Sequence, residues 1–220
     1  MDIDLNKYHK VLPNEYKRIV SYQMDIINAY DFFSKCYLRV KKHYIYTWNN
    51  RTCVPEILTV NFKKRHFSHL CGIEYKNGAT KFTQDIKKNK IDVKNIYIKN
   101  DGSTFQKLDL LANINILNTI NTEISSSGMI SNKHYDTIIN DKRKTLGLVI
   151  KKDNNGSKIP ISLLSISKDY FDHQTSFPVL AIIDEEKMTK EHSKTCICRR
   201  SNCPNKVNEF IDNLLKEPKQ

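Results

Sequence analysis

The chain has 220 residues, with 36 Lys and Arg against 24 Asp and Glu, and its formal net charge is +12 at pH 7. This length can fill one good-sized hydrophobic core with a small appendage, whereas two full domains would be cramped. The excess of cations favours a polyanionic partner, with nucleic acid ahead of a membrane surface, and disfavours an enzyme with an acidic site for small cations.

Membrane and secretion signals are lacking in the sequence. No run approaches the roughly 18 apolar residues of a spanning helix, and the first residues, Met-Asp-Ile-Asp, lack the basic-then-apolar order of a secretion signal. We therefore expect a cytoplasmic protein with no membrane partner. In that compartment the six cysteines are expected to be reduced or metal-bound rather than paired in disulfides.

Periodicity and turn residues predict the elements of the chain. In chain order these are a helix capped by Asn14 that runs to Phe33, strands over 43–48 and 56–62, a short basic helix over 81–88, a strand over 95–99, and a long helix capped by Ser103 that runs to about Ile120. A β-hairpin with an Asn-Gly turn follows over 145–151 and 159–166, then a strand over 179–183 and an amphipathic helix over 206–216. Helices followed by mostly antiparallel strands indicate the α+β class.

The most informative segment runs from 61 to 73 and reads Asn-Phe-Lys-Lys-Arg-His-Phe-Ser-His-Leu-Cys-Gly-Ile. It places two histidines and three cations at the end of an apolar, β-prone run. A histidine exchanges protons near neutral pH while neighbouring cations hold a phosphate, so this composition suits phosphodiester cleavage without a metal. The same composition is also typical of a solvated strand edge.

The string FKKRHFSHLCGIEY, an Ala-Thr-Lys-Phe helix start at 79–82 and the later string QKLDLLANINIL resemble the phage-associated barnase–EndoU–colicin E5/D–RelE-like nuclease family, type 4. The shared features are an HLxG core that ends at Gly72, the Lys107-Leu108 pair and a closing hairpin over 159–164. The resemblance covers roughly 56–184. Cys71 stands where the family has Thr or another small residue.

The resemblance implies N-terminal helices packed on a twisted, mainly antiparallel sheet that presents one concave face to RNA. It also implies a strand that ends in the phenylalanine-rich segment, and catalytic groups that come from different strands. We divide the chain into a nuclease-like domain, 1–186, and a Cys/His-rich tail with a short helix, 187–220, which lies outside the resemblance.

Cleavage of RNA without a metal needs a base at the 2′-oxygen, an acid at the 5′-oxygen and positive charge at the phosphate. His69 ranks above His66 for proton transfer because it lies within the family-like core, although it also fits a buried hydrogen-bonded residue. Lys63, Arg65 and Lys81 are candidates for charge stabilisation. The full set of candidates is His69, His66, Lys81 and Ser162 for catalysis and Lys63, Lys64, Arg65, Thr145 and His173 for substrate binding. The hydroxyls of Ser162, Ser165 and Thr145 are candidates for orienting a phosphate oxygen, and His173 and His134 are reserve acid–base candidates.

The tail contains one imidazole and three thiols, from His192, Cys196, Cys198 and Cys203, which are the ligand types of a structural zinc site. The spacing is not that of a standard zinc finger, so unliganded reduced cysteines and a redox pair remain as alternatives. No cofactor is expected for catalysis.

These patterns favour a metal-independent endoribonuclease that cleaves RNA by attack of the 2′-hydroxyl. The resemblance implies a toxin or effector in conflict between phage and bacterium, with an antitoxin or immunity protein as a possible partner besides RNA. One alternative is an inactive nucleic-acid-binding or inhibitor protein on a nuclease scaffold. Another is a zinc-dependent regulator in which the tail is the functional part.

Overall fold

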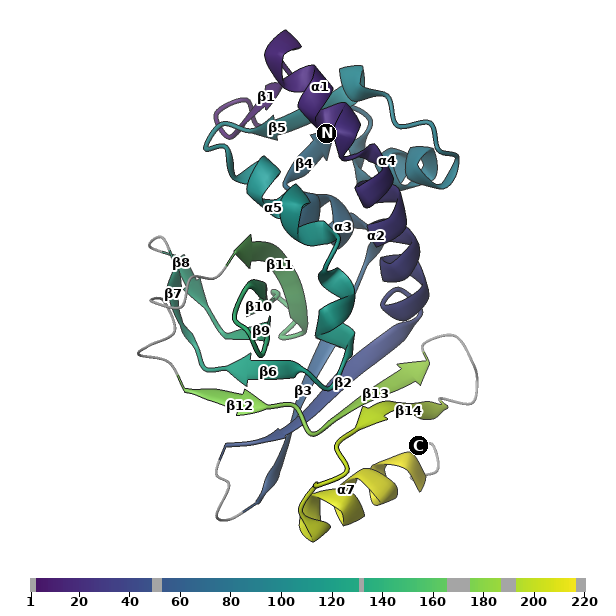
Figure 1. Ribbon diagram of the computed structural model, residues 1–220, viewed down its shortest axis with the longest axis vertical. Helices are drawn as coiled ribbons and strands as arrows, with labels where there is room; N and C mark the ends of the chain where they lie inside the picture. Colours follow the sequence, from purple (N-terminus) through teal and green to yellow (C-terminus); the bar gives the residue numbers. More distant parts are fainter. Residues whose placement is uncertain (1–2, 49–52, 131–132, 166–174, 187–192, 217–220) are drawn as a thin grey trace.

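The computed structural model describes residues 3–48, 53–130, 133–165, 175–186 and 193–216. The helices of the first half of the chain gather at one end of the molecule around a small sheet, and two larger sheets with the C-terminal helix form the other end (Figure 1). Every strand pairing within these residues is antiparallel. The predicted α+β class is therefore confirmed. None of the described helices is long and apolar enough to span a bilayer.

The helices have the following bounds: α1 (Pro13–Ser21), α2 (Gln23–Cys36), α3 (Lys64–Cys71), α4 (Gly78–Lys87), α5 (Ser103–Leu111) and α7 (Asn205–Lys216), with the 3-10 helices η1 (Val93–Asn95) and η2 (Ile114–Asn118). The small sheet has the strand order β1 (Tyr8–Lys10), β5 (Ile96–Lys99), β4 (Ile73–Tyr75). A separate hairpin joins β7 (Gly128–Ile130) to β8 (Lys133–Tyr135).

The two larger sheets build the lower part of the molecule in Figure 1. One has the order β11 (Lys158–Ser165), β10 (Leu146–Lys152), β9 (Thr137–Asp141), β6 (Thr122–Ser125), β12 (Ser176–Pro178). The other has the order β14 (Lys194–Arg199), β13 (Ala181–Glu186), β2 (Val40–Thr47), β3 (Pro55–Asn61). The predicted hairpin and the predicted pair of early strands are both present.

The first predicted helix is two helices, α1 and α2, that meet at Tyr22. Asn14, the predicted cap, lies inside α1 because Pro13 takes the first helical position, where a missing N–H has no helical partner to lose. Leu12 N donates to the Glu15 carboxylate at 2.9 Å and so closes this helix start. The prediction of one continuous helix was wrong.

The helix predicted to run from Ser103 to about Ile120 is also shorter than expected. α5 ends at Leu111, and the chain continues in the separate turn of η2. Asn113 and Asn115, which are weak helix formers, stand at this break. The shorter helix leaves η2 to pack against the five-stranded sheet.

The segment after β3 was expected to continue as a strand, and this was wrong: it turns into α3. Phe67 and Leu70, which are fully buried, are spaced as on one face of a helix. The Phe67 ring packs on α2, with ring centroids 5.0 Å from Tyr30 and 5.3 Å from Phe33. These aromatic contacts belong to the large core and fix α3 in place.

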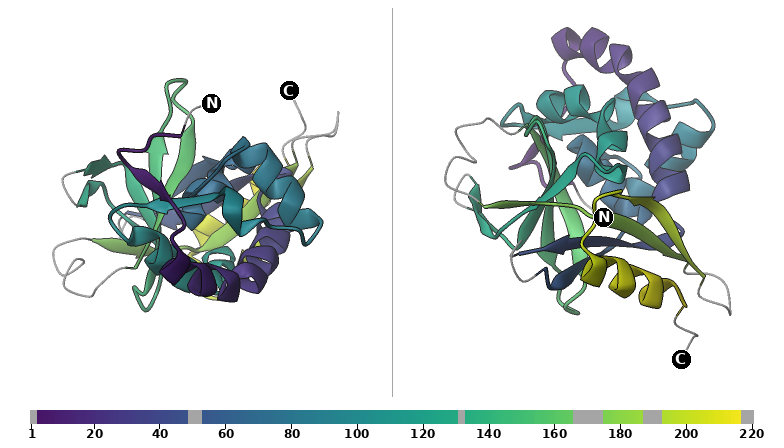
Figure 2. Two further views of the ribbon diagram at one scale, coloured as in Figure 1. Left: turned by 90° about the horizontal axis from the view of Figure 1, so that it is seen from above. Right: turned by 60° about the horizontal axis from the view of Figure 1, so that its bottom comes forward.

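The tail continues the main fold. β14 pairs with β13 along the edge of the four-stranded sheet, and α7 lies against the same sheet (Figure 2). The division after residue 186 therefore falls between two neighbouring strands of one sheet. Whether 187–220 acts as a separate unit stays a prediction.

Gly72 ends α3 in the left-handed conformation, with φ of +67°. A Cβ placed there would lie 3.0 Å from Lys107 Cδ and 3.2 Å from Thr104 Cα. Thr104 Oγ1 also donates to the Gly72 oxygen at 2.7 Å. A glycine is therefore needed both for the turn and for the close approach of α5 to α3.

Gly72→Ala should lower the free energy of unfolding by about 2–4 kcal/mol, because it adds overpacking to backbone strain. Gly102→Ala is the matched control: its φ is +75° and no atom lies within 4 Å of the added Cβ, so strain alone should cost about 1–2 kcal/mol. Urea unfolding of both variants measures the difference. Equal losses of stability would contradict the steric role of Gly72.

Candidate active site

Lys107 is a buried cation that connects three elements. Its side chain lies on α5, the residue is 4% exposed, and Nζ donates to Ser162 Oγ on β11 at 2.8 Å. Nζ also donates to the backbone oxygen of His69, at 3.2 Å, near the end of α3. α3, α5 and β11 pack against one another (Figure 1). The ammonium group is thus held where a helix end, a second helix and a strand meet.

A cavity of about 240 Å³ opens beside this contact, and we name it the Lys107 cavity. Its cationic and titratable lining groups are Lys99, Lys107 and His134, and Ser162 supplies a hydroxyl. Asp101 also lines it, and hydrogen bonding to Ser103, with Lys99 and Lys107 nearby, holds the pKa of this carboxyl below its usual range. The cavity therefore combines cations with a group that can exchange protons near neutral pH.

His69 contacts Lys107 through its backbone oxygen and is not among the residues that line the Lys107 cavity. Partial burial lowers the pKa of its imidazole, Glu74 opposes that shift, and the cations of Lys107, Arg65 and Lys99 add to it. Nδ1 is 3.8 Å from Glu74 Oε1, and the side chain is 47% exposed. A lowered pKa keeps the imidazole neutral at pH 7, which is the form that accepts a proton. The alternative that His69 is a buried hydrogen-bonded residue does not fit this exposure.

The side chain of His66 does not line the Lys107 cavity. It is 2% exposed, and its Nδ1 accepts a hydrogen bond from Lys63 N at 3.1 Å in the first turn of α3. The ring therefore caps a helix start inside the protein. Because it faces the interior, its geometry supports a structural role rather than the catalytic role predicted for it.

The other predicted cations lie apart from the Lys107 cavity. Lys81 on α4 pairs with Asp85 at 2.6 Å along its own helix. Lys63 and Lys64 line a second cavity, of about 620 Å³, that we name the Lys63–Lys64 cavity. Arg65 is exposed between the two, near enough to lower the pKa of His69.

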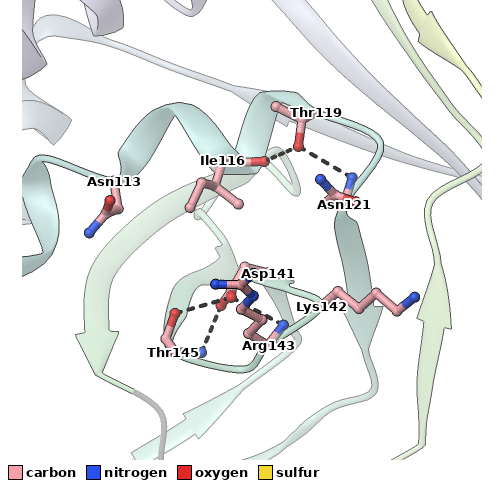
Figure 3. Close-up of a pocket in the computed structure, with 8 residues that line it drawn as sticks. All are labelled: Asn113, Ile116, Thr119, Asn121, Asp141, Lys142, Arg143 and Thr145. Atoms are coloured by element: carbon pink, nitrogen blue, oxygen red, sulfur yellow. Dashed lines mark hydrogen bonds between the residues drawn. The ribbon is translucent and has the colours of Figure 1, made fainter.

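Thr145 lines a third cavity, of about 650 Å³, between η2 and the turn that joins β9 to β10 (Figure 3). The Asp141 carboxylate accepts from Thr145 N at 2.7 Å, from Thr145 Oγ1 at 3.1 Å and from Leu146 N at 2.8 Å. Figure 3 shows Thr145 directed at Asp141. The hydroxyl thus shapes a turn, and Thr145, a candidate for substrate binding, lines a different cavity from Ser162.

The predicted zinc ligands are only partly described. His192, like the candidate substrate-binding His173, lies outside the described residues. Cys198 packs against the large core, whereas Cys203 belongs to a smaller core beneath α7, and burial raises the pKa of both thiols. Cys196, on β14, has a raised pKa for the same reason. In the part of the chain that is described, no three His, Cys, Asp or Glu side chains cluster as metal ligands. The zinc site stays a prediction.

Lys107 was quoted as part of a family pattern but was not predicted as a site residue. A signal for it does exist in the sequence. It lies on the face of α5 that also carries Thr104, Leu108 and Leu111, all of which are buried. A lysine in such a stripe is rarely buried without a partner, so its position indicates a specific contact.

The sequence profile of the family described as phage-Barnase-EndoU-ColicinE5/D-RelE like nuclease 4 matches residues 25–201 of the 220-residue chain. The match reaches further at both ends than the resemblance over 56–184, and it includes α2 and β14. The prediction that the tail from 187 lies outside the pattern was therefore wrong for 187–201, whereas 202–220 do lie outside the match. No curated protein and no solved structure matches the chain. Because the profile covers most of its length, the chain belongs to the phage-Barnase-EndoU-ColicinE5/D-RelE like nuclease 4 family.

Proposed function

We propose that this protein is a metal-independent endoribonuclease whose active site is the Lys107 cavity. The observation that carries the proposal is the Lys107 ammonium group, fixed by Ser162 Oγ and the His69 oxygen, beside an imidazole with a lowered pKa. A fixed cation stabilises charge on a phosphate, and a neutral imidazole removes a proton. Membership of a nuclease family supports nucleic acid as the substrate.

Each residue has a defined part in the reaction that we propose. His69 takes the proton of the ribose 2′-hydroxyl, and the 2′-oxygen then forms a bond to phosphorus. Lys107 and Lys99 stabilise the charge on the pentavalent phosphate, while Ser162 orients one of its oxygens. The bond from phosphorus to the 5′-oxygen breaks, and protonated His134 gives that oxygen a proton. The products are a 2′,3′-cyclic phosphate and a 5′-hydroxyl.

The biological setting is a further part of the proposal. The family name associates these nucleases with phages, which supports a toxin or effector in conflict between phage and bacterium. Its RNA target would lie in the cytoplasm, and an antitoxin or immunity protein is the partner expected for such a nuclease. One observation favours the alternative of an inactive RNA-binding or inhibitor protein: His69 is not among the residues that line the Lys107 cavity.

Cleavage should persist in excess EDTA, leave 2′,3′-cyclic phosphate ends and spare DNA, which lacks the attacking oxygen. Denaturing gels and end analysis of the fragments measure this. Lys107→Met should lower kcat/KM by about 10²–10³, the usual effect of removing a group that stabilises transition-state charge. Lys87→Met, on the exposed end of α4, is the matched control. Strict dependence on magnesium, or equal cleavage of DNA, would contradict the mechanism.

The pH profile tests His69 as the base. Activity should fall as the pH drops through the pKa of His69, below its ordinary value of about 6.5, because protonated imidazole cannot accept a proton. Glu74 raises that pKa, so Glu74→Gln should move the acidic limb of kcat/KM to lower pH.

His69→Gln should lower kcat/KM by about 10²–10⁴ and remove this limb, while the far-UV circular dichroism spectrum stays unchanged. A limb that moves to higher pH in Glu74→Gln, or that survives in His69→Gln, would show that another group titrates.

A further inference from the structure

We propose that the Lys63–Lys64 cavity is a second RNA subsite, which binds a phosphate about two nucleotides from the one cleaved in the Lys107 cavity. This inference rests on the proposed RNA cleavage. It specifies where the RNA strand lies beyond the cleaved phosphate. Three features carry it: the charge of the cavity, its apolar floor and its distance from the Lys107 cavity.

The Lys63–Lys64 cavity offers cations that are available to a phosphate. Lys63 and Lys64 are exposed, and among the described residues no carboxylate forms an ion pair with either. The third lysine that lines it, Lys41, is held by Glu185 at 2.8 Å. The Asp153 carboxylate also lines the cavity, but Oδ1 accepts from Ser157 N at 2.9 Å within its own turn. Lys63 and Lys64 therefore bring two cations against the single Asp153 carboxylate, which leaves an excess of positive charge among the described residues that line the cavity.

The floor of the same cavity is apolar. Leu38, Phe62 and Ile159 line it, and Leu38 and Ile159 are half-buried, so part of each side chain remains accessible. An apolar surface beneath a cationic rim fits one nucleotide of a single strand, with the base on the floor and the phosphate at the rim. The cavity volume of about 620 Å³ leaves room for such a group.

Two independent elements give the distance between the cavities. α3 carries Lys64 in its first turn and His69 in its last, and the five residue steps between them rise about 7.5 Å along the helix axis. β11 lines one cavity with Ile159 and the other with Ser162, and three residues of a strand span about 10 Å. The two estimates are about 7.5 Å and about 10 Å, and an extended single strand covers such distances with no more than about two nucleotides.

Arg65 and the net charge support this direction of the strand. Arg65 is exposed on α3 between the two cavities, and its charge acts on the pKa of His69. Lys64 and Arg65 at the start of α3 and Lys107, which contacts its end, therefore supply cations at both ends of this helix. A single-stranded polyanion is drawn to such cations, and its affinity then depends on salt.

The test compares substrates of different length. Lys63→Gln/Lys64→Gln is measured beside the control pair Lys87→Gln/Lys88→Gln, which removes the same charge from exposed residues at the end of α4. The substrates are a dinucleotide with a single phosphate and RNAs lengthened one nucleotide at a time on either side. For wild type, kcat/KM should rise in a step when two or three nucleotides are added on one side.

In Lys63→Gln/Lys64→Gln the step should vanish, so that the ratio of kcat/KM for the long RNA to that for the dinucleotide falls about tenfold. The log–log salt slope for the long RNA should flatten by about 0.7, because each phosphate of a single strand that the protein neutralises adds roughly 0.7 to the slope. The control pair should keep both the step and the slope. An unchanged ratio, or an equal fall in kcat/KM on both substrates, would overturn the subsite.

Binding separates this inference from the proposed cleavage. If wild type cleaves none of these RNAs, the proposed reaction fails, and the ratio of Kd values for the long RNA and a trinucleotide then carries the same test. A loss of that ratio in Lys63→Gln/Lys64→Gln but not in the control pair supports the subsite. An unchanged ratio overturns it. Thermal melts of both double variants check that the fold is kept.

Discussion

The contact of the Lys107 ammonium group with the His69 oxygen and Ser162 Oγ is the constraint on which this structure depends. A buried cation is strongly unfavourable unless its donors find acceptors. Here one acceptor is a carbonyl at the negative end of α3, and the other is a hydroxyl on β11. Removal of either would leave a charge in the interior, so α3, α5 and β11 are held in one relative position. Folding and the proposed chemistry share this contact.

The six residues from His69 to Glu74 position most of the groups around that contact. The His69 carbonyl holds Lys107 while its imidazole faces solvent, and Leu70 anchors the helix end in the core. Gly72 then turns the chain into β4, which brings Glu74 within 3.8 Å of His69 Nδ1. Cys71 is fully buried, and burial raises the pKa of its thiol, so it serves as an inert small residue. The glycine thus decides both where the base stands and which carboxylate tunes it.

Sequence patterns predicted the structural features that depend on residues close together in the chain. The Asn-Gly turn of the β10–β11 hairpin was identifiable because Gly156 adopts φ of +76°, a conformation that glycine takes readily. The helix α3 was not predicted because Phe67 fits a strand as well as a helix. Only the packing of its ring on Tyr30 and Phe33 favours the helix. The partners of Lys107 lie 38 and 55 positions away, so no window of sequence contains them.

Arg200, directly after β14, connects the end of that strand to two other segments of the chain. Its Nε donates to the Val179 oxygen at 2.8 Å, and its Nη2 donates to the Ile120 oxygen at 2.7 Å. These bonds hold the end of β14 against the segments that precede β13 and β6. Beyond it, α7 buries Val207 and Ile211 against the outer face of the four-stranded sheet, away from α3. That helix therefore stabilises the face of the sheet that carries Ile45 and Ile183, and the strand register places Lys41, which lines the Lys63–Lys64 cavity, on the same face.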